Sequence, residues 1–242
     1  LGIPLPVSEI VKNGYDVIEA IPEGSYAVFV NDITSTMVPE TGPGGRALLQ
    51  HLFNKNLKVI IVSFDMQGPA TYNSYLKPYM EIPGKEYGID YVNLGFIAGG
   101  QTANLAFATD VRSILNTDSD GTPLDDLPIM DKFNSMHDAS VLVAVGSGYR
   151  ENVVAIMQPV ANTPLIVQGS AGAATLAMAF YPDTICGLLT GIKGGAEYEY
   201  LINRPGRAIS IIDAMQIGTL SIVGFVLVGN VLEFMKKQKG RK

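Results

Sequence analysis

The chain has 242 residues, of which 47% are hydrophobic, and its formal net charge is −6 at pH 7. Five of its 17 Lys and Arg lie in the last seven residues, which leaves 12 against 23 Asp and Glu in residues 1–235, and so acidic a surface argues against nucleic-acid binding. The single cysteine, Cys186, excludes an intrachain disulfide and a multi-cysteine metal site, and its apolar neighbours in the sequence are typical of a small core residue.

Residues 1–22 contain two early prolines followed by a short helical pattern, which predicts a lead-in helix that ends before Pro22. From residue 23 to residue 205, short apolar runs typical of buried strands alternate with helical patterns. The predicted strands are 26–30, 58–64, 89–94, 140–145, 164–167 and 184–189, and the predicted helices are 46–54, 70–80, 102–115, 151–159, 171–180 and 195–202, with a loop over 31–45. This alternation predicts a three-layer α/β domain, Rossmann-like, whose mostly parallel sheet carries helices on both faces.

The segment 206–235 predicts a C-terminal transmembrane helix. Its residues 214–232 carry no charge, and this run of about nineteen residues, at 1.5 Å per residue, matches a hydrocarbon core of about 30 Å. The alternative is a buried core helix, but such a helix seldom runs so far without a charge and then ends in a basic cluster.

The tail 236–242 holds five basic residues and no acidic one, whereas only Arg204 and Arg207 lie on the near side of the apolar run. Because cytoplasmic flanks of membrane helices carry an excess of Lys and Arg, the tail is predicted to be cytoplasmic and the α/β domain extracytoplasmic, at the cell membrane. An exported domain needs an upstream signal peptide or a first transmembrane segment, so we expect one of these before Leu1.

In open parallel sheets, ligands bind beyond the carboxyl ends of the strands. The loops at these ends are rich in Gly and hydroxyl side chains, which let main-chain amides approach a carboxylate, a phosphate or another polar group. The candidate ligand-binding residues are Thr34, Ser35, Gly99, Gly100, Gln101, Gly146, Ser147, Gly148, Gly169, Ser170 and Gly194. The alternative is that they serve only turn geometry and helix capping, and none of the loops matches a P-loop, dinucleotide-binding or nucleophile-elbow motif.

Asp32 and Asp65 are the candidate catalytic residues. Each follows a predicted strand, so the two carboxylates could face one another, shift each other's pKa or hold a cation. The alternative for each is a carboxylate that caps the next turn or helix. His51 and His137 are isolated in the sequence, and we expect both at the surface or at an edge rather than in a catalytic or metal-binding constellation.

The polar loop 116–126 imitates the first half of a calcium loop. Asn116, Asp118 and Asp120 supply oxygen side chains at alternate positions before Gly121, and they are the candidate metal ligands. The twelfth position is Leu127 rather than Glu, so a solvated polar turn is the alternative to a calcium site. No other cofactor is predicted.

The predicted membrane helix carries a stripe of residues spaced by three and four, namely Asp213, Gln216, Thr219, Val223, Leu227 and Asn230. Polar groups in hydrocarbon seek partners, and contact with another helix satisfies them. The stripe therefore predicts a homo-oligomer, or pairing with an upstream helix of the same chain.

Several segments together resemble a functionally uncharacterised family of archaeal and bacterial membrane-anchored proteins. The segments that carry the resemblance are GIPLP at 2–6, KVIIVSF at 58–64, KEYGIDY at 85–91, GGAEYE at 194–199 and Asp213-Ala214. The resemblance spans nearly the whole chain and implies an N-terminal transmembrane helix before the α/β domain. It implies no catalytic residue.

Two hypotheses about function follow from the sequence. The first is a membrane-anchored, homo-oligomeric scaffold or a protein that binds a small polar ligand at the strand ends. The second is a carboxylate- or cation-assisted hydrolase or transferase that uses Asp32 and Asp65. The first is favoured because no nucleophile–base pair or cofactor motif is present in the sequence.

Overall fold

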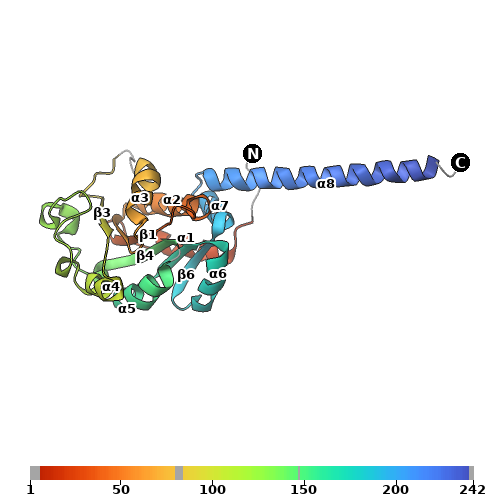
Figure 1. Ribbon diagram of the computed structural model, residues 1–242. Coiled ribbons are helices and arrows are strands. Elements are labelled where there is room, and N and C mark those ends of the chain that lie inside the picture. Colours follow the sequence, from red (N-terminus) through yellow and green to blue (C-terminus); the bar gives the residue numbers. More distant parts are fainter. Residues whose placement is uncertain (1–5, 80–83, 147, 240–242) are drawn as a thin grey trace.

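The computed structural model describes residues 6–79, 84–146 and 148–239. Its six described strands form one sheet in the order β3-β2-β1-β4-β5-β6, and every neighbouring pair is parallel (Figure 1). The strands are β1 (Tyr26–Asp32), β2 (Lys58–Ser63), β3 (Tyr91–Phe96), β4 (Ala139–Gly146), β5 (Leu165–Gly169) and β6 (Ile185–Thr190). This sheet confirms the predicted Rossmann-like α/β fold. The chain reverses its direction of winding between β1 and β4, which are neighbours in the sheet.

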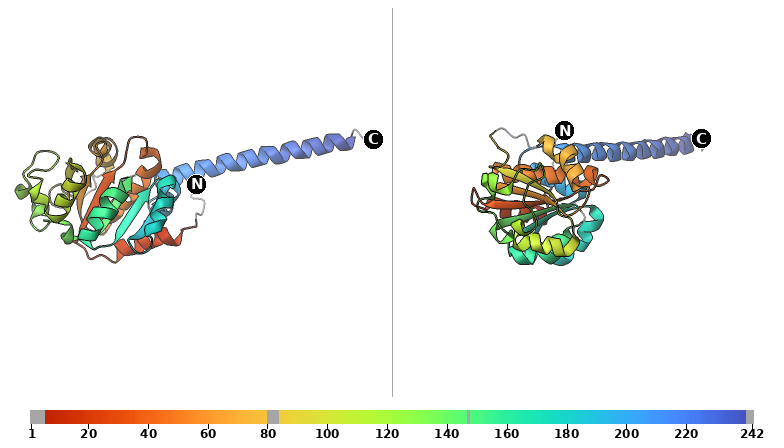
Figure 2. Two further views of the ribbon diagram at one scale, coloured as in Figure 1. Left: turned by 60° about the horizontal axis from the view of Figure 1, so that its bottom comes forward. Right: turned by 60° about the vertical axis from the view of Figure 1, so that its left-hand side comes forward.

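Helices cover both faces of the sheet, as Figure 2 shows. One face packs against α1 (Glu9–Glu19), α2 (Val38–Asn54) and α7 (Gly191–Leu201), and the helical pattern predicted within residues 1–22 forms α1. The other face packs against α4 (Gly100–Thr109), α5 (Gln158–Ala161) and α6 (Ala171–Ala177). Because both faces are covered, the central strand β1 is buried at every position, which explains its continuous apolar run.

The start of α2 differs from the prediction. The helix begins at Val38, inside the predicted loop 31–45, although its first turns contain three glycines and two prolines. A Cβ added to Gly44 would lie 1.9 Å from Gln168 Oε1 and 3.1 Å from Gly195 Cα. Only glycine lets α2 approach β5 and α7 this closely, so tertiary packing outweighs the low helix propensity of this segment.

Other predicted helices are shorter or less regular in the structure. The predicted helix 70–80 consists of α3 (Gly68–Thr71), a π-helical turn at Tyr72–Leu76 and a 3₁₀ turn at Lys77–Tyr79, and Met80 lies outside the described residues. The predicted helix 102–115 ends at Thr109, because Asp110 adopts an extended backbone and caps a separate 3₁₀ turn. The π-helical segment Tyr149–Met157 precedes α5.

His51 is buried, contrary to the expectation of a surface or edge histidine. Its Nδ1 lies 2.8 Å from Tyr198 Oη, and its Nε2 lies 2.8 Å from Glu19 Oε1. Burial is the largest influence on its pKa and lowers it, against the opposing effect of the Glu19 carboxylate. This network joins α1, α2 and α7 on one face of the sheet. His137 is exposed, as expected.

The last described helix, α8 (Arg207–Lys239), projects away from the α/β domain (Figure 1). Its segment Arg207–Lys236 is long and apolar enough to span a membrane, with a most apolar window of mean hydropathy 2.0 that is 6% buried. It is the one described helix that meets both criteria. The predicted long apolar helix is thus confirmed, and its apolar side chains are uncovered, unlike those of a core helix.

Candidate functional site

Asp32 lies at the carboxyl end of β1, where β1 and β4 meet at the change in winding direction. Its Oδ1 accepts hydrogen bonds from the main-chain N–H groups of Phe64 (2.7 Å) and Asp65 (3.1 Å) and from the Ser63 hydroxyl (3.3 Å). These donors come from the end of β2, the next strand in the sheet. Neighbouring strand ends therefore fix the orientation of the Asp32 carboxyl group.

The second oxygen of this group, Asp32 Oδ2, is buried and has no hydrogen-bond partner among the described atoms. The residue is only 2% exposed. Burial is the largest influence on the pKa of Asp32 and raises it, although the three hydrogen bonds to Oδ1 act in the opposite direction. A buried polar oxygen without a partner is costly, so this atom is the strongest local indication of an incomplete site.

Glycines border Asp32 Oδ2. A Cβ added to Gly148 would lie 2.8 Å from Asp32 Oδ2 and 3.2 Å from the side-chain nitrogen of Asn152. At Gly146 the backbone has φ +124°, and a Cβ there would lie 1.9 Å from the main-chain oxygen of Asp32. The glycine-rich loop after β4 thus passes directly beside Asp32, which is possible only without side chains at these positions. Ser147, between the two glycines, lies outside the described residues.

Two asparagines complete this polar cluster. The Asn104 side chain donates a hydrogen bond of 2.8 Å to Asn152 Oδ1, and Asn104 Oδ1 is itself buried without a partner among the described atoms. Asn31 Oδ1 is likewise without one, while its amide donates to Gly68 O and Thr71 Oγ1. Sequence reasoning missed Asn104 and Asn152, because neither forms a motif and only the tertiary fold brings them together, whereas Asn31 lies directly before Asp32 in β1.

Asp65 does not pair with Asp32 through its carboxylate. Its Oδ1 instead accepts the main-chain N–H of Gln67 at 2.8 Å, which is the turn-capping alternative for this residue. Nearby, Gln67 Oε1 accepts the main-chain N–H of Ser35 at 3.1 Å, and the hydroxyls of Thr34 and Thr36 lie 3.1 Å apart. The structure thus brings the Asp65 main chain to Asp32 and leaves the Asp65 side chain at the surface turn.

The remaining candidate residues serve the fold where they are described. Gly99 and Gly100 have φ +116° and +63° at the start of α4, with Gln101 exposed beside them. Ser170 caps α6 by accepting the main-chain N–H of Ala173 at 3.3 Å, directly after Gly169. Gly194 packs on Leu189, where an added Cβ would lie 2.7 Å from main-chain atoms.

The predicted calcium ligands form a polar turn. Asp118 is 5% exposed, and its oxygens accept hydrogen bonds from Asp120 N (2.9 Å), Thr122 N (2.8 Å) and the Tyr87 hydroxyl (2.8 Å). Asn116 contributes its main-chain oxygen to Leu124 N. Within the part of the chain that the structure describes, no group of three or more His, Cys, Asp and Glu is arranged to hold a metal ion.

The start of α8 is capped by a carboxylate that was not among the candidate residues predicted from the sequence. Glu199, near the end of α7, is 4% exposed and accepts the main-chain N–H groups of Gly206 (2.9 Å), Ala208 (3.0 Å) and Ile209 (2.9 Å). These are donors that the first turn of a helix leaves without an intrahelical partner. A negative charge at this position also complements the helix dipole, so Glu199 fixes α8 to the domain.

The direction of α8 follows from its contacts. Ala208 packs against Gly195, and Ile212 and Met215 line a cavity of about 540 Å³ together with Thr190 and Gly194. Thus α8 runs antiparallel to α7 and leaves the domain beside the carboxyl end of β6. This is the same edge of the sheet that carries Asp32, since all the strands are parallel.

Comparisons with protein-family models, with curated proteins and with solved structures found no match. The resemblance to an uncharacterised membrane-protein family therefore stays an expectation from the sequence.

Proposed function

We propose that this protein binds a small polar ligand at the carboxyl edge of its sheet and is anchored to a membrane by α8. The observation that supports the ligand is the buried oxygen Asp32 Oδ2, which has no described partner and lies beside a glycine-rich loop. Ligand sites of open parallel sheets occur at this position, where the winding direction changes.

A hydroxyl-bearing ligand suits this oxygen best. An ionised carboxylate only accepts hydrogen bonds, whereas a protonated one also donates, and burial raises the pKa of Asp32. A hydroxyl group can donate to the first form and accept from the second. The amides of Asn104 and Asn152 are suited to further hydroxyl groups, so a polyol or a sugar is the class that we propose.

The proposed membrane geometry follows from α8. Because α8 leaves the domain beside the carboxyl ends of the strands, that edge would face the bilayer. The basic tail favours a cytoplasmic C-terminus and an extracytoplasmic domain.

The proposed assembly is a homo-oligomer. Thr219, Val223, Leu227 and Asn230 of the stripe are exposed, and a second helix would cover them. Asp213 lies apart from them, since it is 7% exposed beside the domain.

Ligand binding is tested by thermal unfolding of the full-length protein in detergent with a panel of monosaccharides and polyols. We expect at least one compound to raise the unfolding temperature of the wild type and of Asp65→Asn, but not of Asp32→Asn. Asp65→Asn is the matched control, because its carboxylate only caps a turn. If no compound acts, or if both variants respond like the wild type, Asp32 is not the binding group.

The assembly is tested by light scattering of the full-length protein in mild detergent, corrected for bound detergent. A discrete multiple of the 25.9 kDa chain is expected for the wild type, and Asn230→Leu should reduce it. A monomeric wild type would contradict the homo-oligomer and leave the ligand proposal intact.

A further inference from the structure

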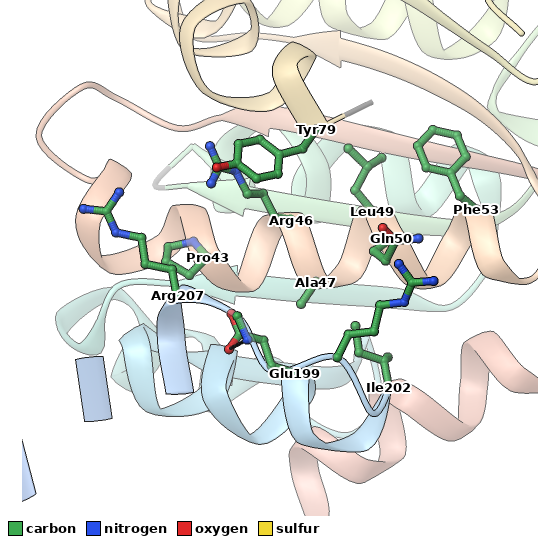
Figure 3. A pocket seen from close by; sticks show the side chains of 12 residues that line it. Pro43, Arg46, Ala47, Leu49, Gln50, Phe53, Tyr79, Glu199, Ile202 and Arg207 are labelled. Carbon is green, nitrogen blue, oxygen red and sulfur yellow. Dashed lines mark hydrogen bonds between the residues drawn. The ribbon is translucent and has the colours of Figure 1, made fainter. Parts of the chain in front are cut away.

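A second cavity lies on the flank of the domain, away from Asp32. It has a volume of about 300 Å³ and is bounded by α2, by Tyr79 and by the segment that joins α7 to α8. Figure 3 shows Leu49 and Phe53 of α2 on one side and Glu199 and Ile202 on the other. Its volume is at the lower end of the range of small-molecule sites.

Three arginines line this cavity: Arg46, Arg204 and Arg207. No described carboxylate forms an ion pair with any of them. Glu199 is the one acidic residue in the described lining, and its oxygens accept the main-chain N–H groups at the start of α8. The cavity therefore has an excess of positive charge that no described residue neutralises by direct contact.

Arg46 is held in a fixed orientation. Its guanidinium lies between the rings of Tyr75 and Tyr79, 3.3 Å from each ring centroid. Its Nε and Nη2 donate to the main-chain oxygen of Tyr75 at 3.2 and 2.6 Å. Stacking and hydrogen bonding therefore order this side chain before any ligand binds, so binding costs less conformational entropy.

The electrostatic surroundings of Arg46 favour an anion. Burial is the largest influence on its pKa and lowers it, the contacts with Tyr75 and Tyr79 raise it, and the nearby charge of Arg207 lowers it. Arginine stays protonated in proteins, so Arg46 and Arg207 keep two positive charges whose mutual repulsion a bound anion would offset. Guanidinium groups match the geometry of both phosphate and carboxylate oxygens, because they donate pairs of parallel N–H bonds, and three arginines suit the double negative charge of a phosphate monoester.

We propose that this cavity binds the phosphate group of a small, water-soluble phosphate monoester. The arginines would hold the phosphate, while Leu49, Phe53 and Ile202 contact the organic part and Gln50 offers a polar contact. No residue of this cavity belongs to the Asp32 cluster, so the inference is independent of the proposed polyol site.

A lipid headgroup is a less suitable source of the phosphate. Seven residues separate Arg207 from Ala214, where the uncharged run begins, or about 10 Å of helix. The headgroup layer on one side of a bilayer is only about 5–8 Å thick. If α8 spans a membrane, the cavity therefore lies beyond that layer.

The test uses the full-length protein in detergent. Binding of glycerol 3-phosphate is measured by ³¹P NMR line broadening and by calorimetry, with glycerol as the phosphate-free comparison. In the Asp32→Asn background, which removes the proposed polyol site, the protein should bind glycerol 3-phosphate and not glycerol. Arg204→Gln with Arg207→Gln should weaken that binding about tenfold or more, since each loses charge-assisted hydrogen bonds.

The matched control is Arg150→Gln with Lys132→Gln, which removes two exposed positive charges outside the cavity lining. It should bind like the wild type, and thermal unfolding checks that both double variants are folded. Equal weakening in both double variants, equal binding of glycerol, or no binding of glycerol 3-phosphate at millimolar concentration would overturn the proposal. Binding of dihexanoyl phosphatidylglycerol without binding of glycerol 3-phosphate would overturn the assignment to a soluble ligand.

Discussion

The α/β domain and α8 contain similar apolar side chains in opposite surroundings. In the domain, Phe29, Leu48 and Ile60 are 0% exposed, whereas in α8 Leu220 is 66% exposed and Phe225 is 78% exposed. The domain therefore contains its own nonpolar environment, and α8 requires one from outside the chain. Burying each such side chain contributes roughly 1.5–3 kcal/mol of favourable free energy, so contact of α8 with a bilayer or another apolar surface is strongly favoured.

The largest expected effect comes from charging the exposed helix. Val223→Lys with Val226→Lys places two charges near the middle of the apolar run, at about 2.5–3.5 kcal/mol each in a bilayer. We expect this variant to leave the carbonate-resistant membrane fraction of cells that express it. Met66→Lys, at a 79% exposed position of the domain, is the control and should remain in that fraction. Retention of the double variant would contradict a membrane-spanning α8.

The second-largest effect is expected from removing the contact between the α/β domain and α8. Glu199→Ala removes three hydrogen bonds to the start of α8 and should lower the free energy of unfolding by about 2–4 kcal/mol. Glu199→Gln keeps an acceptor oxygen and should cost less. Urea denaturation in detergent measures both, with Glu151→Ala, an exposed carboxylate, as the control. If Glu199→Ala matches the control, Glu199 does not hold α8 in place.

Glycine-to-alanine substitutions should affect the α/β domain and α8 differently. Gly44→Ala would force a methyl group into the contact with Gln168 and Gly195, and it should destabilise the domain by about 1–3 kcal/mol. Gly218 in α8 has no atom within 4 Å of an added Cβ, so Gly218→Ala should leave the domain's unfolding unchanged. Thermal unfolding compares the two variants. A smaller oligomer for Gly218→Ala would mean that another chain packs on that glycine.

The smallest expected effect is a change in pH dependence at Asp32. Because its folded pKa is raised, the folded state binds this proton more tightly than the unfolded state does. Its stabilising contribution is present below the unfolded pKa, near the ordinary 3.8, and is lost as the pH rises through the folded value. Asp32→Asn lacks this dependence, so its stability relative to the wild type should rise across that window. Urea denaturation at several pH values measures this, and parallel curves for the two proteins would contradict it.

The sequence by itself determined the class of fold and the nature of α8. Six apolar runs separated by helical patterns were sufficient for a parallel sheet covered on both faces, because strands buried on both sides need continuous apolar residues. The run 214–232 was sufficient for a long apolar helix, because its length and lack of charge are local properties. Asp32 could be identified as a strand-end carboxylate because its position after an apolar run is also a local property of the sequence.

Tertiary structure decided what each polar group does. Asp32 and Asp65 look alike in the sequence, yet Asp32 is a buried carboxyl with one oxygen that has no partner among the described atoms, and Asp65 caps a turn. The difference arises because burial depends on which strands are neighbours. The glycines near the start of α2 predicted a loop, but close packing on α7 holds them in a helix. In the flank cavity, Arg46 of α2 lies beside the segment that holds Glu199, Arg204 and Arg207, and only the packing of α2 on α7 and α8 brings these two segments together.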